Sequence, residues 1–181
     1  MHIEKKKIKD LIILRSEVHK DNRGFFKEVN KKKILKKKLI FDCLSHSKKN
    51  TVRGLHFQRK NPQGKFITVV RGEILDVAVD LRKNSKTFGK YFSIKIKEDS
   101  NFSIFIPENF AHGFACLSKT CTLYYRCTNY RHKESETTLR WNDPDLKINW
   151  KIKKPILSIK DKSGILLSDI KNNFSFYQRS N

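Results

Sequence analysis

Apolar and polar residues alternate over several short segments of the chain, which is the pattern of strands with one buried face. In residues 73–81 (EILDVAVDL), Leu and Val occupy every second position from Leu75 onward, while Asp76 and Asp80 lie on the opposite face. Residues 91–98 (YFSIKIKE) and 121–128 (CTLYYRCT) alternate in the same way. The pattern therefore predicts three β-strands, each with one face toward a core.

Turn-forming residues separate these segments. Gly, Asn, Asp, Ser and Pro mark residues 71–72, 82–89, 98–101 and 107–109, and such residues commonly end strands. The sequence also predicts one short helix around residues 31–39, and a less periodic C-terminal third of loops and short helices that wrap the strands. Many short strands with few helices are typical of an antiparallel sandwich or barrel.

The length of the chain and its cysteines indicate one cytoplasmic domain. A chain of 181 residues can bury a core without disulfides or a metal, so we expect a single domain over residues 1–181. The four cysteines form no CxxC pair, which favours reduced thiols in a cytoplasmic protein. No apolar segment suits a signal peptide or a membrane span, so we expect a soluble protein without a membrane partner.

The chain is strongly basic, with 40 Lys and Arg residues against 18 Asp and Glu residues and a formal net charge of +22. Such an excess attracts polyanions, so a nucleic-acid-binding barrel is one alternative for the function. Most of the excess is lysine, whereas arginine is the residue that reads bases in a bidentate manner. The codon bias of an AT-rich genome also explains the lysines, and we expect a solvated surface without a nucleic-acid partner.

Charged or imidazole groups stand beside glycine or aromatic residues in three segments, 21–28, 53–58 and 107–115, and a fourth segment, 157–161, places Lys160 beside Asp161. His56 and His112 lie in two of these segments. Metal-binding barrels of this size usually have an HxH pair, a nearby carboxylate and a later histidine, and this chain has no HxH pair, so no metal is expected. The other histidines are interpreted as structural: His2, His19, His46 and His132.

Eight motifs, in the order DNRGFF, RGLHFQ, QGK, VDLRKNSKTFGK, IPENFAHGF, YYRCTNY, RWNDPDLKINW and LSIKD, resemble those of the dTDP-4-dehydrorhamnose 3,5-epimerase family. The match runs from about Leu11 to about Ser168. The resemblance implies an all-β cupin fold, which is a double-stranded β-helix or jelly-roll barrel, with short peripheral helices. It also implies a homodimer that needs no cofactor.

The resemblance assigns the catalytic roles. The C–H bonds at C3 and C5 of a 4-keto sugar are acidic, so inversion needs a base on one face, an acid on the other, and a donor at the ketone oxygen. His56 matches the family's base, and Asp161 matches the carboxylate that orients it. Tyr125 matches the acid, and Lys65 matches the lysine near the C4 oxygen.

Further residues match positions that bind the substrate in this family: Arg23, Glu28, Arg53, His112, Glu136 and Lys160. The arginines are natural partners of a diphosphate. Arg53 and His56 would point to opposite faces of a regular strand because they are three positions apart, which is an odd spacing. If both face the substrate, the strand must bulge, and Gly54 is the position where it can do so at low cost.

The chain departs from the family pattern at two places near the expected substrate. Phe41 and Cys43 replace two amide residues that contact the nucleotide, and neither can read a base edge as an amide does. Phe41 could stack on a larger base instead, so we expect a GDP-linked sugar, such as a heptose, in preference to a dTDP-linked hexose. Arg131 replaces a tyrosine of the family and is expected close enough to the substrate to alter which carbons are inverted.

The sequence therefore predicts an epimerase that inverts C3, C5 or both in a nucleotide-linked 4-keto-6-deoxy sugar. Such enzymes serve the synthesis of bacterial capsule and other surface polysaccharides. One alternative keeps the fold and inverts only C3 or isomerises the ketone. The other is the basic nucleic-acid-binding barrel, which would bind DNA or RNA with a strong dependence on salt.

Overall fold

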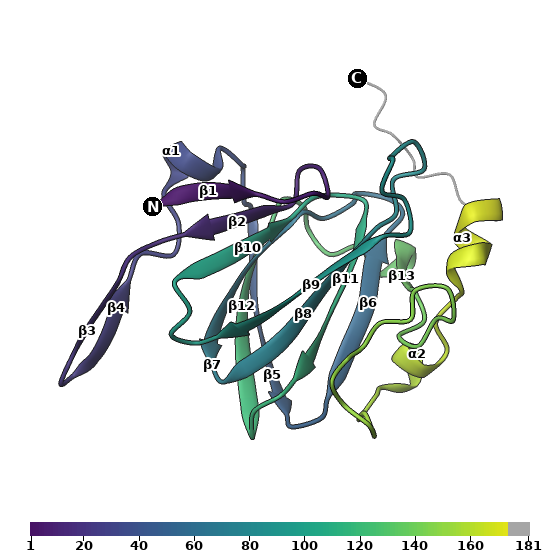
Figure 1. The fold of residues 1–181 in the computed structure, drawn as a ribbon. Helices are drawn as coiled ribbons and strands as arrows, with labels where there is room; N and C mark the ends of the chain where they lie inside the picture. Colours follow the sequence, from purple (N-terminus) through teal and green to yellow (C-terminus); the bar gives the residue numbers. More distant parts are fainter. Residues whose placement is uncertain (174–181) are drawn as a thin grey trace.

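Two antiparallel sheets face each other and form a barrel (Figure 1). The computed structural model describes residues 1–173. In spatial order, the six-stranded sheet contains β1 (His2–Lys5), β2 (Ile12–Arg15), β10 (Phe102–Ile106), β7 (Lys65–Arg71), β12 (Thr120–Cys127) and β5 (Phe41–Lys48). The five-stranded sheet contains β13 (Glu136–Thr138), β6 (Val52–Gln58), β11 (Phe110–Cys116), β8 (Glu73–Asp80) and β9 (Tyr91–Lys97). The predicted all-β cupin barrel is confirmed.

A separate hairpin and three short helices lie outside the two sheets. The hairpin consists of β3 (Val18–Asp21) and β4 (Gly24–Lys27) and projects away from the barrel (Figure 1). The helices are α1 (Lys32–Leu35), α2 (Ile159–Lys162) and α3 (Leu167–Asn173), with one 3₁₀ turn, η1 (Lys133–Ser135). The short peripheral helices and the loop-rich C-terminal third agree with the prediction.

The helix predicted over residues 31–39 is much shorter than expected. Lys36 has a left-handed φ of 46° and ends α1 after one turn. No side chain caps the N-terminus of α1, and no acidic residue lies in its first turn. Lys32 and Lys36, and likewise Lys33 and Lys37, would lie on the same side of a longer helix, where like charges destabilise it.

Side chains from both sheets fill the barrel interior. Ile67, Ile104 and Leu123 of the six-stranded sheet pack against Ile74 and Ile96 of the other sheet. Burying each such side chain contributes roughly 1.5–3 kcal/mol relative to exposure. On β9, Ile96 is buried and Lys97 is exposed, as the alternation predicts.

Strand β8 differs from the half-buried strand that its alternation predicts, because both of its faces are buried. Leu75 and Val77 pack outward against the C-terminal segment, which contributes Trp150 and Ile170. The opposite face carries Asp76 and Asp80, whose exposed fractions are 1% and 0%. The alternation identifies the two faces, but the opposite sheet and the C-terminal segment cover both of them.

Asp80 shows how an acidic side chain is accommodated inside the barrel wall. Its carboxylate accepts hydrogen bonds from Arg82, Ser85 and Thr87, with distances of 2.6–2.8 Å from Asp80 Oδ2 to the three side chains. Charge-assisted bonds of this kind offset the cost of burying the carboxylate. The loop from residue 82 to residue 89 is thereby tied to β8.

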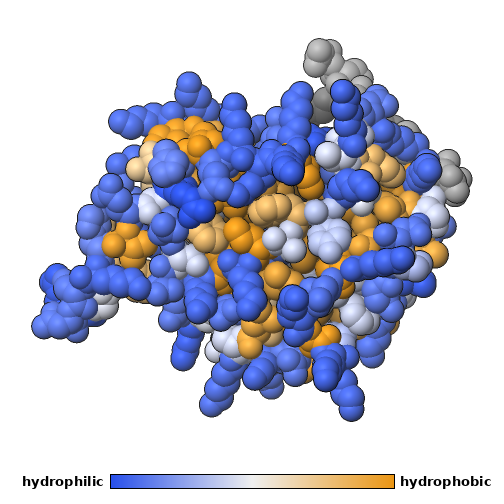
Figure 2. Space-filling view, in the orientation of Figure 1, coloured by the Kyte–Doolittle hydropathy of each residue, from blue (hydrophilic) through white to orange (hydrophobic). Residues whose placement is uncertain are grey.

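Hydrophilic side chains cover much of the face of the molecule seen in Figure 2. Figure 2 shows long hydrophilic side chains that project around the visible face, with apolar side chains between them. On this face they do not gather into a single stripe, which agrees with the interpretation of a solvated surface. Within residues 1–173, no helix is both long and apolar enough to cross a membrane.

Candidate active site

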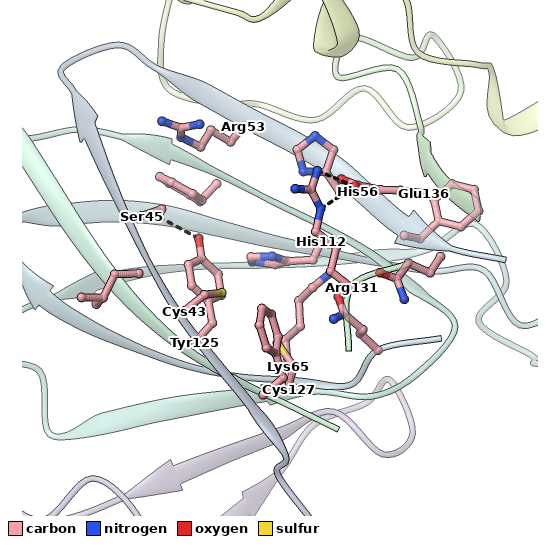
Figure 3. A pocket seen from close by; sticks show the side chains of 16 residues that line it. Cys43, Ser45, Arg53, His56, Lys65, His112, Tyr125, Cys127, Arg131 and Glu136 are labelled. Atoms are coloured by element: carbon pink, nitrogen blue, oxygen red, sulfur yellow. Dashed lines mark hydrogen bonds and ion pairs between the residues drawn. The ribbon is translucent and has the colours of Figure 1, made fainter. Parts of the chain in front are cut away.

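A cavity of about 400 Å³ opens between the two sheets. Its wall on the six-stranded sheet consists of Phe41, Cys43, Leu44, Ser45, Lys65, Tyr125 and Cys127. Its wall on the five-stranded sheet consists of Arg53, His56, Phe57, Gln58, His112, Phe114 and Glu136, and two loop residues, Gln63 and Arg131, complete the lining. In Figure 3, His112 lies between Tyr125 and His56. Most of the residues predicted for the site therefore line one cavity.

His56 and Asp161 form a hydrogen-bonded pair across 105 residues of sequence. His56 Nε2 lies 2.6 Å from Asp161 Oδ1. The Asp161 side chain is 4% exposed, whereas that of His56 is 31% exposed. An ionised carboxylate only accepts hydrogen bonds, so Nε2 of His56 carries the proton and Nδ1 keeps its lone pair. Nδ1 is therefore the nitrogen that can take a proton from a substrate.

The surroundings of Asp161 keep its carboxyl group ionised. Burial raises the pKa of Asp161, but hydrogen bonds from His56, from Ser158 and from the backbone N–H of Gly54 outweigh it, so the pKa lies below its ordinary value. An ionised carboxylate beside the imidazole also stabilises the imidazolium that forms when His56 accepts a proton. The pair thus has the properties of a general base.

Tyr125 lies in the wall opposite His56, on β12 of the other sheet. Its hydroxyl is 3.1 Å from Ser45 Oγ. Burial raises the pKa of Tyr125, and the hydrogen bond with Ser45 only partly opposes this. Its phenol therefore stays protonated at neutral pH and can donate a proton into the cavity.

Lys65 places a cation in the cavity. It is the first residue of β7 and lies beside Cys127 in the register with β12. Burial lowers the pKa of Lys65, while Cys127 and Glu136 oppose this change. An ammonium group in a cavity shielded from water can stabilise negative charge that develops on a substrate oxygen.

A second histidine–aspartate pair lines the cavity wall. His112 Nε2 lies 2.8 Å from Asp76 Oδ2, and their side chains are 5% and 1% exposed. His112 is the register partner of His56 on the neighbouring strand, so the two imidazoles lie side by side. Asp76 was not among the residues predicted for the site. Its acidic side chain on an otherwise apolar strand was the feature of the sequence that could have indicated it.

The bulge predicted at Gly54 is confirmed. His56 pairs with His112, and Arg53 pairs with Phe114, so three steps along β6 match only two along β11. Gly54 has a φ of +119°, a conformation that favours glycine. Because of this extra residue, Arg53 and His56 both line the cavity.

Arg131, Glu136 and Lys160 form a chain of ion pairs at one side of the cavity. Arg131 Nη2 lies 2.7 Å from Glu136 Oε2, and Lys160 Nζ lies 3.1 Å from Glu136 Oε1. Burial raises the pKa of Glu136, but the two cations outweigh it and hold the pKa below its ordinary value. Arg131 and Glu136 line the cavity, whereas Lys160 reaches it only through Glu136.

Phe41 and Cys43, the two positions on β5 where the chain departs from the family pattern, both line the cavity. Phe41 is 6.1 Å from Tyr130 between ring centroids, so two aromatic rings stand together at this side of the cavity. A hydrogen bond with the Cys127 thiol lowers the pKa of Cys43 to about 7, burial opposes this, and Lys65 assists it. Neither Phe41 nor Cys43 supplies an amide.

Arg23 and Glu28 do not lie at the cavity of their own chain. Arg23 lies at the end of the β3–β4 hairpin, where its side chain is 86% exposed and pairs with Asp21. Glu28 pairs with Lys31 at 2.6 Å. The hairpin projects away from the barrel (Figure 1), so these two predicted substrate ligands are separated from the rest of the site.

The fold is a cupin barrel, and one cavity has the His56–Asp161 pair at one wall and Tyr125 at the opposite wall. The family model for dTDP-4-dehydrorhamnose 3,5-epimerase matches residues 5–169. The chain therefore belongs to the dTDP-4-dehydrorhamnose 3,5-epimerase family, and it is an isomerase. Family membership also favours the enzyme over the nucleic-acid-binding alternative.

Individual relatives agree with this assignment. The chain is 43% identical over 160 residues to the dTDP-4-dehydrorhamnose 3,5-epimerase of Methanothermobacter thermautotrophicus, covering 84% of this chain and 86% of the relative. The crystal structure of a 3,5-epimerase from Legionella pneumophila in complex with dTDP-4-keto-L-rhamnose is 37% identical, with a TM-score of 0.87 and coverage of 92% and 93%. A dTDP-4-dehydrorhamnose 3-epimerase of Streptomyces niveus is 35% identical and covers 71% of this chain and 63% of its own length.

Proposed function

We propose that the chain inverts both C3 and C5 of a dTDP-linked 4-keto-6-deoxyhexose without a cofactor. The observation that carries this proposal is the placement of the His56–Asp161 pair and of Tyr125 in opposite walls of one cavity. A sugar ring between these walls has a base on one face and an acid on the other. This is the arrangement that inversion of a carbon next to a ketone requires.

The reaction proceeds by proton transfer through an enolate. His56 Nδ1 removes the proton from the carbon, and the electron pair of the C–H bond moves to the C4 oxygen. Lys65 stabilises the negative charge on that oxygen. The electron pair then returns from the C4 oxygen and restores the ketone, while Tyr125 donates its proton to the carbon from the opposite face. Before the next step, solvent takes the proton from His56 and returns one to Tyr125. The same sequence at the second carbon completes the double inversion.

The proposal also specifies dTDP as the nucleotide of the substrate. The relatives are named for dTDP-linked sugars, and this supports a dTDP-linked hexose. The GDP-linked heptose expected from Phe41 and Cys43 has no such support and is not confirmed. The Phe41 and Tyr130 rings hold thymine by stacking, which does not require an amide.

A homodimer would bring Arg23 and Glu28 to a substrate. Two large apolar side chains on the projecting hairpin, Phe25 and Phe26, are 44% and 66% exposed. If the hairpin packs against a second copy, these rings become buried, and Arg23 with Glu28 joins the cavity of the partner. The arginine then binds the diphosphate, as the family resemblance implies.

Mixing two inactive variants tests the dimer. His56→Ala chains lack the base, and Arg23→Ala chains lack the predicted diphosphate ligand. If the hairpin serves the partner's cavity, mixed dimers have one complete site, and an equal mixture recovers about a quarter of the wild-type activity. Failure to recover activity, in a mixture shown by mass spectrometry to contain mixed dimers, would contradict the shared site.

A reaction that inverts only C3 is the second candidate, because one relative is named as a 3-epimerase. Arg131, at the position of a family tyrosine, lies in the cavity and could bias which carbon meets the base. Incubation with dTDP-4-keto-6-deoxyglucose in deuterated water, followed by NMR, distinguishes the two reactions. Deuterium at C3 and C5 supports the proposal, and deuterium at C3 alone supports the 3-epimerase.

The same experiment with the GDP-linked sugar tests the nucleotide. Faster exchange with the GDP-linked sugar would overturn the dTDP assignment. No exchange with either sugar, in a chain that is folded and binds dTDP, would overturn the epimerase mechanism. The product is a 4-keto sugar that still requires reduction, and we place its use in the cytoplasmic synthesis of precursors for surface polysaccharides.

A further inference from the structure

The hydroxyl of Ser158 contacts the aspartate of the base at two points. Ser158 is the N-cap of α2, and its Oγ accepts a hydrogen bond from the backbone N–H of Asp161 at 3.1 Å. The same Oγ lies 2.8 Å from Asp161 Oδ2 and donates its proton to it. A hydroxyl has one proton and two lone pairs, so it can make both bonds at once.

The two oxygens of Asp161 therefore have different partners. Oδ1 accepts from His56 at 2.6 Å, and Oδ2 accepts from Ser158. The backbone N–H of Gly54 also donates to this carboxylate, and the carboxylate cannot rotate without breaking one of these bonds. Ser158 is the side-chain donor on Oδ2, and together with the Gly54 N–H it holds the plane of the carboxylate and the direction of its bond to His56.

Ser158 acts from outside the substrate cavity. It lines a second cavity of about 400 Å³ together with Thr51, Arg53 and Asp161, and it is not part of the lining that contains His56 and Tyr125. A change at Ser158 therefore alters the base without altering the wall that meets the sugar. Ser158 itself is exposed. When its hydroxyl is removed, a water molecule could therefore donate to Asp161 Oδ2 in its place and offset part of the loss.

We propose that Ser158 is a positioning residue for the general base, which holds the Asp161 carboxylate ionised and directed at His56. This inference rests on the proposed epimerase function for its effect on turnover. The donor at Oδ2 withdraws charge from the carboxylate. Without that donor the carboxylate is more basic, and the His56–Asp161 pair retains a proton to higher pH.

Three substitutions separate this role from helix capping. Ser158→Ala removes both the cap and the donor. Ser158→Asp keeps a good N-cap acceptor but has no proton to donate, and it adds a negative charge beside Asp161. Ser158→Thr keeps the cap and the donor. Ser163→Ala is the control, because Ser163 lies at the other end of α2 and its hydroxyl donates to backbone carbonyls, including that of Ile159.

The expected result is a loss in kcat with little change in KM. Ser158→Ala should lower kcat about tenfold, the lower end of the effect of partners that orient a functional histidine. The acid limb of the pH profile should move to higher pH in Ser158→Ala and further in Ser158→Asp, because two carboxylates then favour the imidazolium. Ser158→Thr and Ser163→Ala should both match the wild type.

The titration of His56, followed by NMR in the chain without substrate, gives a readout that does not depend on turnover. The His56 pKa should rise in Ser158→Ala and in Ser158→Asp. If Ser158→Asp restores wild-type kcat and the wild-type His56 titration, Ser158 is only a helix cap and the inference fails. If the wild-type chain does not exchange deuterium at all, the proposed function fails, and the His56 titration still decides the role of Ser158.

Discussion

Arg53 and His56 both line the same cavity although they are three positions apart on one strand. The bulge at Gly54 produces this arrangement. A Cβ atom at Gly54 would lie 2.5 Å from Gly113 Cα and 2.7 Å from the carbonyl oxygen of His112. The backbones of β6 and β11 therefore approach each other so closely that only glycine fits.

Gly54→Ala should destabilise the fold and separate Arg53 from the base. The positive φ alone costs about 1–3 kcal/mol for a residue with a side chain, and the contact with the Gly113 backbone adds to it. Gly24→Ala is the matched control, because Gly24 has a φ of +131° with no atom within 4 Å of the added Cβ. Urea unfolding of both variants measures the difference. Equal losses of stability would show that the close approach of the strands contributes nothing.

His56→Asn should abolish deuterium exchange at both carbons while the fold is kept. An amide cannot accept the substrate proton as an imidazole does, and general-base assistance is typically worth roughly 10²- to 10⁴-fold. Asp161→Asn should reduce the rate of exchange by a smaller factor, because His56 remains and loses only its charged partner. NMR in deuterated water measures both losses. Near-normal exchange in a folded His56→Asn variant would remove His56 from the role of base.

Tyr125→Phe should separate exchange from inversion. His56 can still remove a proton and return one from its own face, but the donor on the opposite wall is missing. Deuterium uptake at the carbon should therefore exceed the formation of inverted product, which NMR and product analysis measure in the same sample. Inversion at the wild-type rate would show that Tyr125 is only a packed aromatic residue. Tyr124→Phe is the control, since the Tyr124 hydroxyl bonds to Asp42 and lies outside the cavity.

Three strands, β8, β9 and β12, were predictable because one apolar face leaves a clear period of two. The burial of Asp76 and Asp80 could not be predicted, because alternation shows which residues share a face but does not show what covers that face. Asp76 is inside because β8 is a central strand between β11 and β9, with the other sheet across the barrel. Its partner, His112, comes from a segment 36 residues further along.

The pairing of His56 with Asp161 could not have been found from spacing alone. His56 and Asp161 are 105 residues apart, and each has a common structural interpretation when taken singly. Only the family resemblance assigned the two residues to one site. The motif that contains Asp161, LSIKD, also contains Ser158. Arg23 shows the opposite limit, because a motif assigns it to the substrate whereas the structure places it outside the cavity of its own chain.

Stability at acid pH should depend on Asp80. Burial raises the pKa of Asp80, but hydrogen bonds from Arg82, Thr87 and Ser85 outweigh it and hold the pKa below the ordinary value of 3.8. The unfolded chain then takes up a proton near pH 3.8, and the folded chain does so only at lower pH. The contribution of Asp80 to stability is complete above about pH 5 and is lost as the pH falls through 3.8 toward the folded pKa.

Comparing the wild type with Asp80→Asn tests this dependence. The difference in free energy of unfolding should be largest near neutral pH and should shrink as the pH is lowered below about 4. Urea unfolding at a series of pH values measures it. A difference that is constant from pH 7 to pH 3 would mean that the charge of Asp80 does not contribute.

Phe41→Ala should weaken the binding of dTDP. The Phe41 ring lines the cavity beside Tyr130, and stacking of a base on an aromatic ring is worth roughly 1–3 kcal/mol. Titration calorimetry with dTDP should therefore show a loss of affinity of about 5- to 160-fold, whereas Phe102→Ala, on β10 and outside the cavity, should bind normally. Cys43→Asn restores an amide of the family pattern and should tighten the binding of dTDP if the thymine base lies against β5. Unchanged affinity in both Phe41→Ala and Cys43→Asn would place the base elsewhere.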